Sequence, residues 1–193
     1  YSDFDLIPKF AQVLEDPTQG KRFIVLHIYG SHPLACDRVE DYPKIFNDND
    51  IEKKNEYLNC YITSIKKTDD FIKKVYETLK ENEQKTHRTF SMIYFSDHGL
   101  AHKNDSLYVS NLYKQDYEVP FIMFSSDSIK RIEINEKQSA FNFMYGFTQW
   151  LGIKEKHLSG VDFFNPKEQK IKVFDWENII DVNLLKDDPA KLH

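Results

Sequence analysis

Two short segments carry the side chains best suited to chemistry, Gly30-Ser31-His32-Pro33 and Asp97-His98-Gly99. Each places a histidine directly behind an apolar run, and the second adds a carboxylate beside the imidazole. Aspartate oxygen and neutral imidazole nitrogen are ordinary zinc ligands, and they also suit manganese. A tight turn after such ligands often needs a positive φ, which glycine tolerates, and this would account for Gly99. The residue types therefore predict a metal site at Asp97 and His98.

Ordinary structural roles compete with this interpretation. Asp97 also suits the cap of a following helix, and His32, beside a proline, suits a turn. His27 lies inside an apolar run, where a hydrogen-bonded core histidine is expected. His102 is close enough in sequence to Asp97 and His98 to reach a ligand, although loop-forming residues surround it. The metal interpretation is favoured because both histidine segments follow apolar strands.

Four apolar runs predict the strands that position these segments. Residues 23–29 form a continuous apolar run bounded by turn residues, typical of a central strand covered on both faces. Further strands are expected at 89–95 and 119–124, and a late edge strand at 171–174. Ligands of parallel sheets bind beyond the carboxyl ends of the strands. The segments that follow the first two strands fall in such positions.

Helical periodicity predicts three helices, at about 6–14, 55–81 and 136–151, the last ending at Gly152. The long helix carries one apolar stripe, formed by Leu58, Tyr61, Ile62, Ile65, Ile72, Val75, Tyr76 and Leu79. If Ile65 is buried on this stripe, Ile65→Ala should cost about 2–5 kcal/mol. Strands that alternate with helices predict an α/β layered domain with a mostly parallel sheet.

Composition narrows the class of protein. The length of 193 residues suggests one domain, whole or in part. A formal net charge of -5 disfavours a general nucleic-acid binder, and 40% hydrophobic residues are too many for a disordered chain. No apolar run approaches the ~20 residues of a membrane span. Cys36 and Cys60 fit either two thiols in a reducing compartment or one disulfide in an oxidising one.

Taken in order, several stretches resemble the phosphoethanolamine transferases that modify lipid A and lipooligosaccharide, members of the alkaline phosphatase/sulfatase superfamily. The matching stretches are VLHIYGSHP at 25–33, the helix from NEYLN at 55–59 to Asp69, YFSDHG at 94–99, YEVPFI at 117–122, and the opening YSDFDLIP. The resemblance covers most of residues 1–155. It implies a three-layer α/β/α sandwich of the alkaline phosphatase type, with residues 1–193 as the C-terminal portion of a periplasmic catalytic domain.

The same resemblance implies a zinc-dependent transfer of phosphoethanolamine from phosphatidylethanolamine to lipid A or lipooligosaccharide core. In the family, a threonine attacks the donor phosphorus and carries the group to the acceptor. Asp97 and His98 match zinc ligands, with manganese as the alternative ion. His32 matches a catalytic histidine that contacts the phosphoryl group or a second metal, and His102 is a further substrate-binding candidate. N-terminal membrane helices would anchor the enzyme at the periplasmic face of the bacterial inner membrane.

The chain departs from the family pattern at three points. A further histidine of the family would fall near Ser110, with His102 as its only substitute, and no glutamate follows Gly99. The nucleophilic threonine and another acidic zinc ligand lie upstream of the region matched by Tyr1. This chain is therefore expected to carry part of the active site and to be inactive alone. Two alternatives follow: a sulfatase-like hydrolase or phosphoglycerol transferase, and an inactive binding or regulatory homologue.

Overall fold

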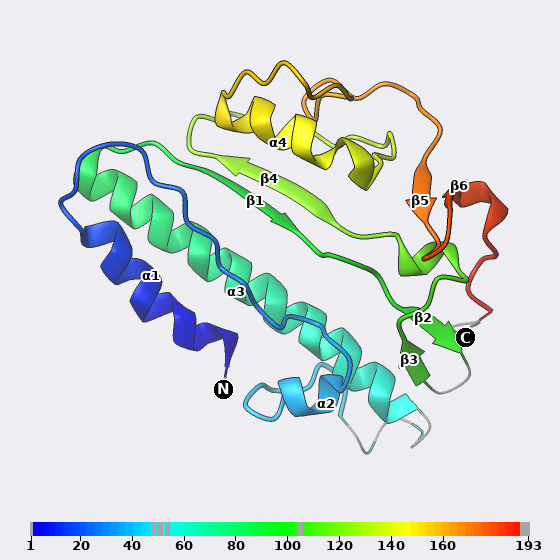
Figure 1. Cartoon of the computed structure of the whole chain (residues 1–193). Coiled ribbons are helices and arrows are strands. Elements are labelled where there is room, and N and C mark those ends of the chain that lie inside the picture. Colours follow the sequence, from blue (N-terminus) through cyan, green and yellow to red (C-terminus); the bar gives the residue numbers. More distant parts are fainter. Residues whose placement is uncertain (1, 48, 50–51, 53–54, 104–105, 190–193) are drawn as a thin grey trace. The chain divides into compact units, whose positions relative to one another are not determined.

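The structure, a computed structural model, describes residues 2–47, 49, 52, 55–103 and 106–189. The chain divides into two compact units. Figure 1 labels the helices and strands along the chain. The first unit comprises Tyr1–Phe95, Asn104–Leu107 and Phe121–Ser128, and the second comprises the remaining segments Ser96–Lys103, Tyr108–Pro120 and Ile129–His193. Each unit is described by itself.

Two helices form the core of the first unit. Helix α1 (Leu6–Glu15), which follows a 3-10 turn at Asp3–Asp5, packs beside the long helix α3 (Glu56–Thr86), as Figure 1 shows. Their buried contact cluster consists of Phe10, Leu14, Phe71 and Val75. The short helix α2 (Ala35–Arg38) packs on α3, where a disulfide joins Cys36 to Cys60. The structure thus decides between the two cysteine states that the sequence left open.

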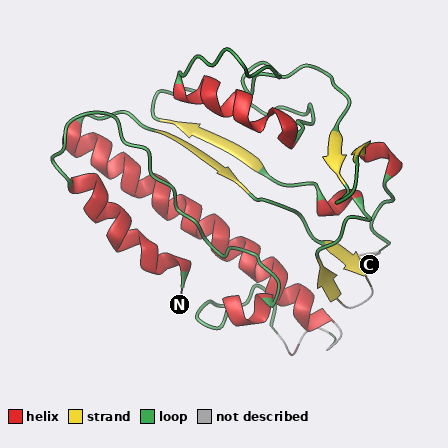
Figure 2. Cartoon of the chain, in the orientation of Figure 1, coloured by secondary structure: helices red, strands yellow, loops and turns green. Residues whose placement is uncertain are grey.

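Residues 23–29 are extended but form no strand, so they appear as loop in Figure 2. Their burial alternates: Ile24, Leu26 and Ile28 pack against the helical core, whereas Phe23 and Val25 are exposed. His27 is also exposed, so its prediction as a core histidine is wrong. The expected two-sided central strand is wrong for the described residues as well, because no neighbouring strand is paired with this segment and only its even-numbered face is packed.

Strands β1 (Ser91–Phe95) and β4 (Phe121–Ser125) lie close to the positions predicted from the apolar runs. They pair antiparallel, with Ile93 opposite Met123. On one face Tyr76 of α3 packs against Phe124, with ring centroids 5.5 Å apart. The predicted mostly parallel sheet is therefore not what these strands form. The described residues between them, 96–103 and 106–120, contain no α-helix of the kind that carries a parallel crossover.

The apolar stripe predicted for the first half of α3 is wrong at Ile65, whereas Tyr61 is partly buried and packs on the cluster of Ala35, Val39 and Cys60. Ile65 is 48% exposed, while polar residues are buried instead: Asn59, Thr63, Ser64, Lys67 and Thr68. The cause is the loop that packs on this half of the helix. Thr63 accepts a hydrogen bond from the Ile45 amide at 3.1 Å, and Asn59 bonds both the amide and the carbonyl of Phe46. Because the loop covers this half of the helix and its backbone groups need hydrogen-bond partners there, polar side chains take this face.

The second unit contains helix α4 (Phe143–Leu151), which a 3-10 turn precedes and Gly152 terminates at a φ of 71°. The helix begins later than predicted. Strands β5 (Lys172–Phe174) and β6 (Ile179–Asp181) pair antiparallel and confirm the late strand. Short strands β2 (Ala101–Lys103) and β3 (Ser106–Tyr108) follow β1 along the chain. No helix in the described ranges has the length and apolar character needed to span a bilayer.

Candidate functional site

The Asp97-His98-Gly99 loop follows directly after β1 and presents two potential metal ligands. The side chain of Asp97 is 85% exposed and that of His98 is 35% exposed. His98 Nδ1 lies 2.8 Å from the Gly99 carbonyl oxygen. When Nδ1 carries the proton and donates it to this carbonyl, the lone pair of the ring is on Nε2. Nε2 lies 3.8 Å from Asp97 Oδ1, so the two candidate ligand atoms are neighbours.

This spacing fits a single zinc ion. Zinc binds imidazole nitrogen at about 2.0–2.1 Å and carboxylate oxygen at about 2.0–2.2 Å, so two such ligands of one ion lie at most about 4.3 Å apart. The described residues nevertheless contain no cluster of three or more histidine, cysteine, aspartate or glutamate side chains that could hold a metal. A zinc site uses three or four protein ligands. Asp97 and His98 therefore fit as two ligands of a centre that needs further ligands.

The turn at residues 110–118 holds this loop in place. The Gly99 amide donates a 2.8 Å hydrogen bond to the carbonyl of Asp116. A Cβ atom on Gly99 would lie 1.9 Å from the carbonyl oxygen of Gln115 and 2.8 Å from that of Glu118. Gly99 does not have a positive φ, so the predicted reason for this glycine is wrong. The loop requires glycine because the backbone of the turn approaches it so closely.

Asp116 organises that turn and was missed by the sequence analysis. Its carboxylate is buried and accepts hydrogen bonds from the amide and hydroxyl of Ser110 and from the amide of Tyr113, the two amides at 3.1 and 3.2 Å. Ser110, near which the family resemblance predicts a further histidine, is a structural partner of Asp116. An aspartate in a polar loop resembles any surface aspartate, so no sequence signal would have singled it out.

His102 lies in β2, and its main-chain amide donates to the carboxylate of Asp188. In the part of the chain that the structure describes, it forms no three-ligand cluster with Asp97 and His98. The structure therefore places His102 in the same unit as the candidate ligands without making it a third one. Its suggested substrate contact stays a prediction.

His32 belongs to the first unit, on the loop after residues 23–29. Its side chain is exposed, and its ring meets the edge of the Tyr29 ring with centroids 6.2 Å apart. The turn is built by Gly30, with a φ of 55°, and by Asp3, whose carboxylate accepts hydrogen bonds from the amides of Tyr29 and Gly30 at 3.0 and 2.9 Å. Asp3 thereby fixes the backbone that carries His32, a role that sequence alone did not reveal.

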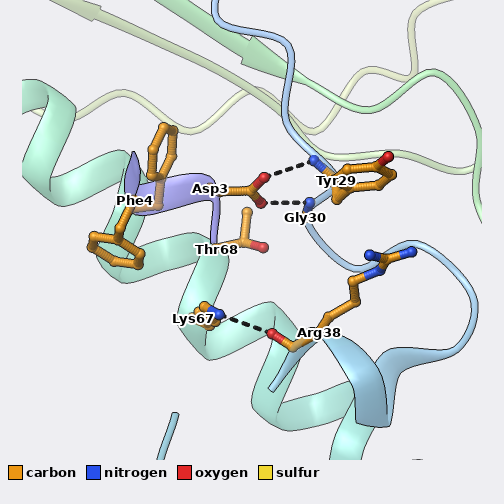
Figure 3. A pocket seen from close by; sticks show the side chains of 8 residues that line it. Asp3, Phe4, Tyr29, Gly30, Arg38, Lys67 and Thr68 are labelled. Atoms are coloured by element: carbon orange, nitrogen blue, oxygen red, sulfur yellow. Dashed lines mark hydrogen bonds between the residues drawn. The ribbon is translucent and has the colours of Figure 1, made fainter. Parts of the chain in front are cut away.

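A small pocket opens beside this loop (Figure 3). It is lined by Asp3, Phe4, Tyr29, Gly30, Arg38, Lys67, Thr68 and Phe71. The Lys67 ammonium donates to the Arg38 carbonyl at 2.9 Å and to the Asp41 carboxylate. The hydrogen bond from Lys67 lowers the pKa of Asp41 below its ordinary value. The Arg38 guanidinium lies over the Tyr29 ring, 4.2 Å from its centroid. Neither Arg38 nor Lys67 was predicted as a site residue.

Comparison with known proteins assigns the family. The sulfatase family profile matches residues 1–153. A putative phosphoethanolamine transferase of Haemophilus influenzae is 72% identical over 105 residues, which are 54% of this chain and 22% of that protein. Phosphoethanolamine transferase OpgE of Escherichia coli K12 is 37% identical over 162 residues, covering 81% of this chain and 29% of its own length. No solved structure matches the chain significantly.

A more distant relative is phosphoethanolamine transferase EptA of Helicobacter pylori, 25% identical over 177 residues, or 85% of this chain and 32% of that protein. The chain spans less than a third of the length of each of these three relatives. The profile match nevertheless extends over most of the chain and includes both histidine loops. The chain belongs to the sulfatase family of the alkaline phosphatase/sulfatase superfamily, among relatives named phosphoethanolamine transferases.

Proposed function

We propose that the intact protein transfers phosphoethanolamine from phosphatidylethanolamine to a hydroxyl or phosphate oxygen of lipid A or lipooligosaccharide core, and that this chain carries part of the zinc-dependent active site. The observation that carries the proposal is the pairing of Asp97 Oδ1 and His98 Nε2 at 3.8 Å, directly after β1, in a chain whose relatives are named phosphoethanolamine transferases. Donor, acceptor and metal all belong to the proposal.

Asp97 and His98 would bind the zinc ion, which supplies Lewis-acid stabilisation of the charge that builds on phosphoryl oxygens. The Gly99 carbonyl holds the His98 ring in the orientation that presents Nε2. Gly99 and Asp116 hold the loop itself, so the two ligand side chains start from a fixed backbone. His32 is exposed and available to donate a hydrogen bond to a phosphoryl oxygen.

The bond changes follow from the proposed donor. By the family resemblance, a threonine hydroxyl supplied by another part of the intact protein attacks phosphorus. The bond between phosphorus and the diacylglycerol oxygen breaks, and diacylglycerol leaves with a proton. An acceptor oxygen then attacks the same phosphorus, the bond between phosphorus and the threonine oxygen breaks, and the threonine regains a proton as the acceptor hydroxyl loses one. We also propose that the catalytic domain faces the periplasm and is anchored at the inner membrane by segments beyond these residues.

The test uses full-length protein in detergent with head-group-labelled phosphatidylethanolamine and lipid A. The proposal predicts equal release of diacylglycerol and formation of labelled lipid A, and predicts that Asp97→Ala abolishes both. Release of diacylglycerol with the label appearing as free phosphoethanolamine would instead indicate the hydrolase alternative. A donor that remains intact with the wild-type protein under zinc supplementation would contradict the proposed function and favour the inactive homologue.

A further inference from the structure

Arg38 carries a positive charge that forms no ion pair with any residue that the structure describes, although it lines a pocket with other charged groups. The other charged groups that line the pocket of Figure 3 are satisfied. Asp3 accepts two backbone hydrogen bonds, and Lys67 donates to a carbonyl and to Asp41. Within the described ranges, Arg38 forms no ion pair, and its Nε is buried without a hydrogen-bond acceptor. Such a group is expensive to leave unpaired and calls for an explanation.

The position of Arg38 links it to the loop that carries His32. Its guanidinium covers one face of the Tyr29 ring at 4.2 Å from the centroid, and the His32 imidazole meets the same ring at 6.2 Å. Figure 3 shows the Arg38 side chain extending toward Tyr29. Tyr29 is 60% exposed, and His32 is exposed as well. One exposed aromatic ring therefore contacts both the Arg38 cation and the His32 imidazole, which places the two groups at the same accessible surface.

We propose that Arg38 is a substrate-binding residue that holds an oxygen of a phosphate monoester or diester beside His32. The inference rests on the proposed function and deepens it. A planar guanidinium matches the oxygens of a phosphate group in two parallel hydrogen bonds, and stacking on Tyr29 fixes the plane of that guanidinium. The pocket has room for about one water molecule, ≈ 20 Å³. One of the two phosphate oxygens that the guanidinium binds would enter it, while the other oxygen and the remainder of the ligand lie at its mouth.

The surroundings of Arg38 permit a clean substitution. Lys67 bonds the main-chain carbonyl of Arg38, and that bond does not depend on the side chain. The disulfide between Cys36 and Cys60 ties α2 to α3 independently of residue 38. A change of the Arg38 side chain should therefore alter the charge of the surface without releasing the helix that carries it.

Steady-state transfer by the full-length protein tests the assignment with Arg38→Gln and Arg38→Lys. The matched control is Lys9→Gln, which removes an exposed positive charge from α1 of the same unit. Arg38→Gln should raise one KM about tenfold or more, the value of a hydrogen bond to a charged group, with kcat changed little. Arg38→Lys should show a smaller rise, and Lys9→Gln none. A higher KM for the phosphatidylethanolamine donor assigns the donor phosphate to Arg38, and a higher KM for the acceptor assigns a phosphate of the acceptor.

Unchanged KM values in folded Arg38→Gln would overturn the inference, and if that variant fails to fold, unchanged values in Arg38→Lys would do the same. Titration of the full-length protein with inorganic phosphate, followed by ³¹P line broadening, separates this result from a failure of the proposed function. Binding that is weakened in both Arg38 variants and retained in Lys9→Gln would support the phosphate site even if no transfer is detected. Equal broadening in all four proteins would contradict it.

Discussion

Gly99→Ala offers a quantitative test of the loop that presents Asp97 and His98. The added Cβ would lie 1.9 Å from the Gln115 carbonyl oxygen. Ordinary contact begins at 3.4 Å, so the two backbones must separate by about 1.5 Å. That movement would break the 2.8 Å hydrogen bond between the Gly99 amide and Asp116. Overpacking of about 1–3 kcal/mol and a lost hydrogen bond of about 0.5–1.5 kcal/mol predict a total loss of about 1.5–4.5 kcal/mol.

Urea unfolding followed by tryptophan fluorescence measures this loss, because Trp150 and Trp176 both belong to the second unit, as Gly99 does. Gly152→Ala is the matched control. Its Cβ meets nothing within 4 Å, so only its positive φ of 71° opposes alanine, at a cost of about 1–2 kcal/mol. If Gly99→Ala destabilises the unit no more than Gly152→Ala does, the close approach of loop and turn is wrong.

Three further predictions concern the first unit. Reduction of the Cys36–Cys60 disulfide, or its replacement by two serines, should lower the free energy of unfolding by about 3.4 kcal/mol, the value expected for a sequence separation of 24. Urea denaturation followed by circular dichroism measures the loss, and an unchanged free energy on reduction would contradict the prediction. Ile65→Ala should lower the free energy of unfolding by less than about 1 kcal/mol, because Ile65 is 48% exposed. Phe71 is 3% exposed, so Phe71→Ala should cost about 3–5 kcal/mol. The reverse order would support the burial of Ile65 that the sequence predicted. The hydrogen bond from Lys67 lowers the pKa of Asp41 in the folded protein. The stabilisation by Asp41 should therefore be fully present above its ordinary pKa of about 3.8 and should vanish as the pH falls through the lower folded value. A difference in unfolding free energy between wild type and Asp41→Asn that persists in acid would refute this.

Local periodicity predicted the helices well where an apolar face meets another helix. Phe10 and Leu14 of α1 meet Phe71 and Val75 of α3, and all four are buried. The same reasoning failed near Ile65, because the first half of α3 packs on a loop whose backbone groups bond polar side chains of the helix. A helical stripe indicates which residues share a face, but the partner of that face is set by tertiary packing.

Strand pairing was less predictable than strand position. The apolar runs placed β1 and β4 within about two residues, but their antiparallel pairing depends on residues far apart in the chain. Residues 23–29 have the composition of a central strand, and their even-numbered side chains pack on the core. Without a paired neighbour, the composition alone does not make them a strand.

The candidate site was predictable in its ligands and unpredictable in its supports. Asp97, His98 and His32 stand out because they follow apolar runs. Asp3, Arg38 and Asp116 are charged residues in polar segments, where a surface role and a site role look alike. Only the structure shows that Asp3 bonds the loop before His32 and that Asp116 supports Gly99.

The most direct test of the central claim is metal-dependent transfer by the full-length protein. We expect chelation to abolish the transfer of phosphoethanolamine by the wild-type protein and added zinc to restore it. Asp97→Ala should remain folded, since the Asp97 side chain is 85% exposed, and should show neither transfer nor restoration. Turnover that survives complete removal of metal, or that is unchanged in Asp97→Ala, would contradict the assignment of Asp97 and His98 as zinc ligands.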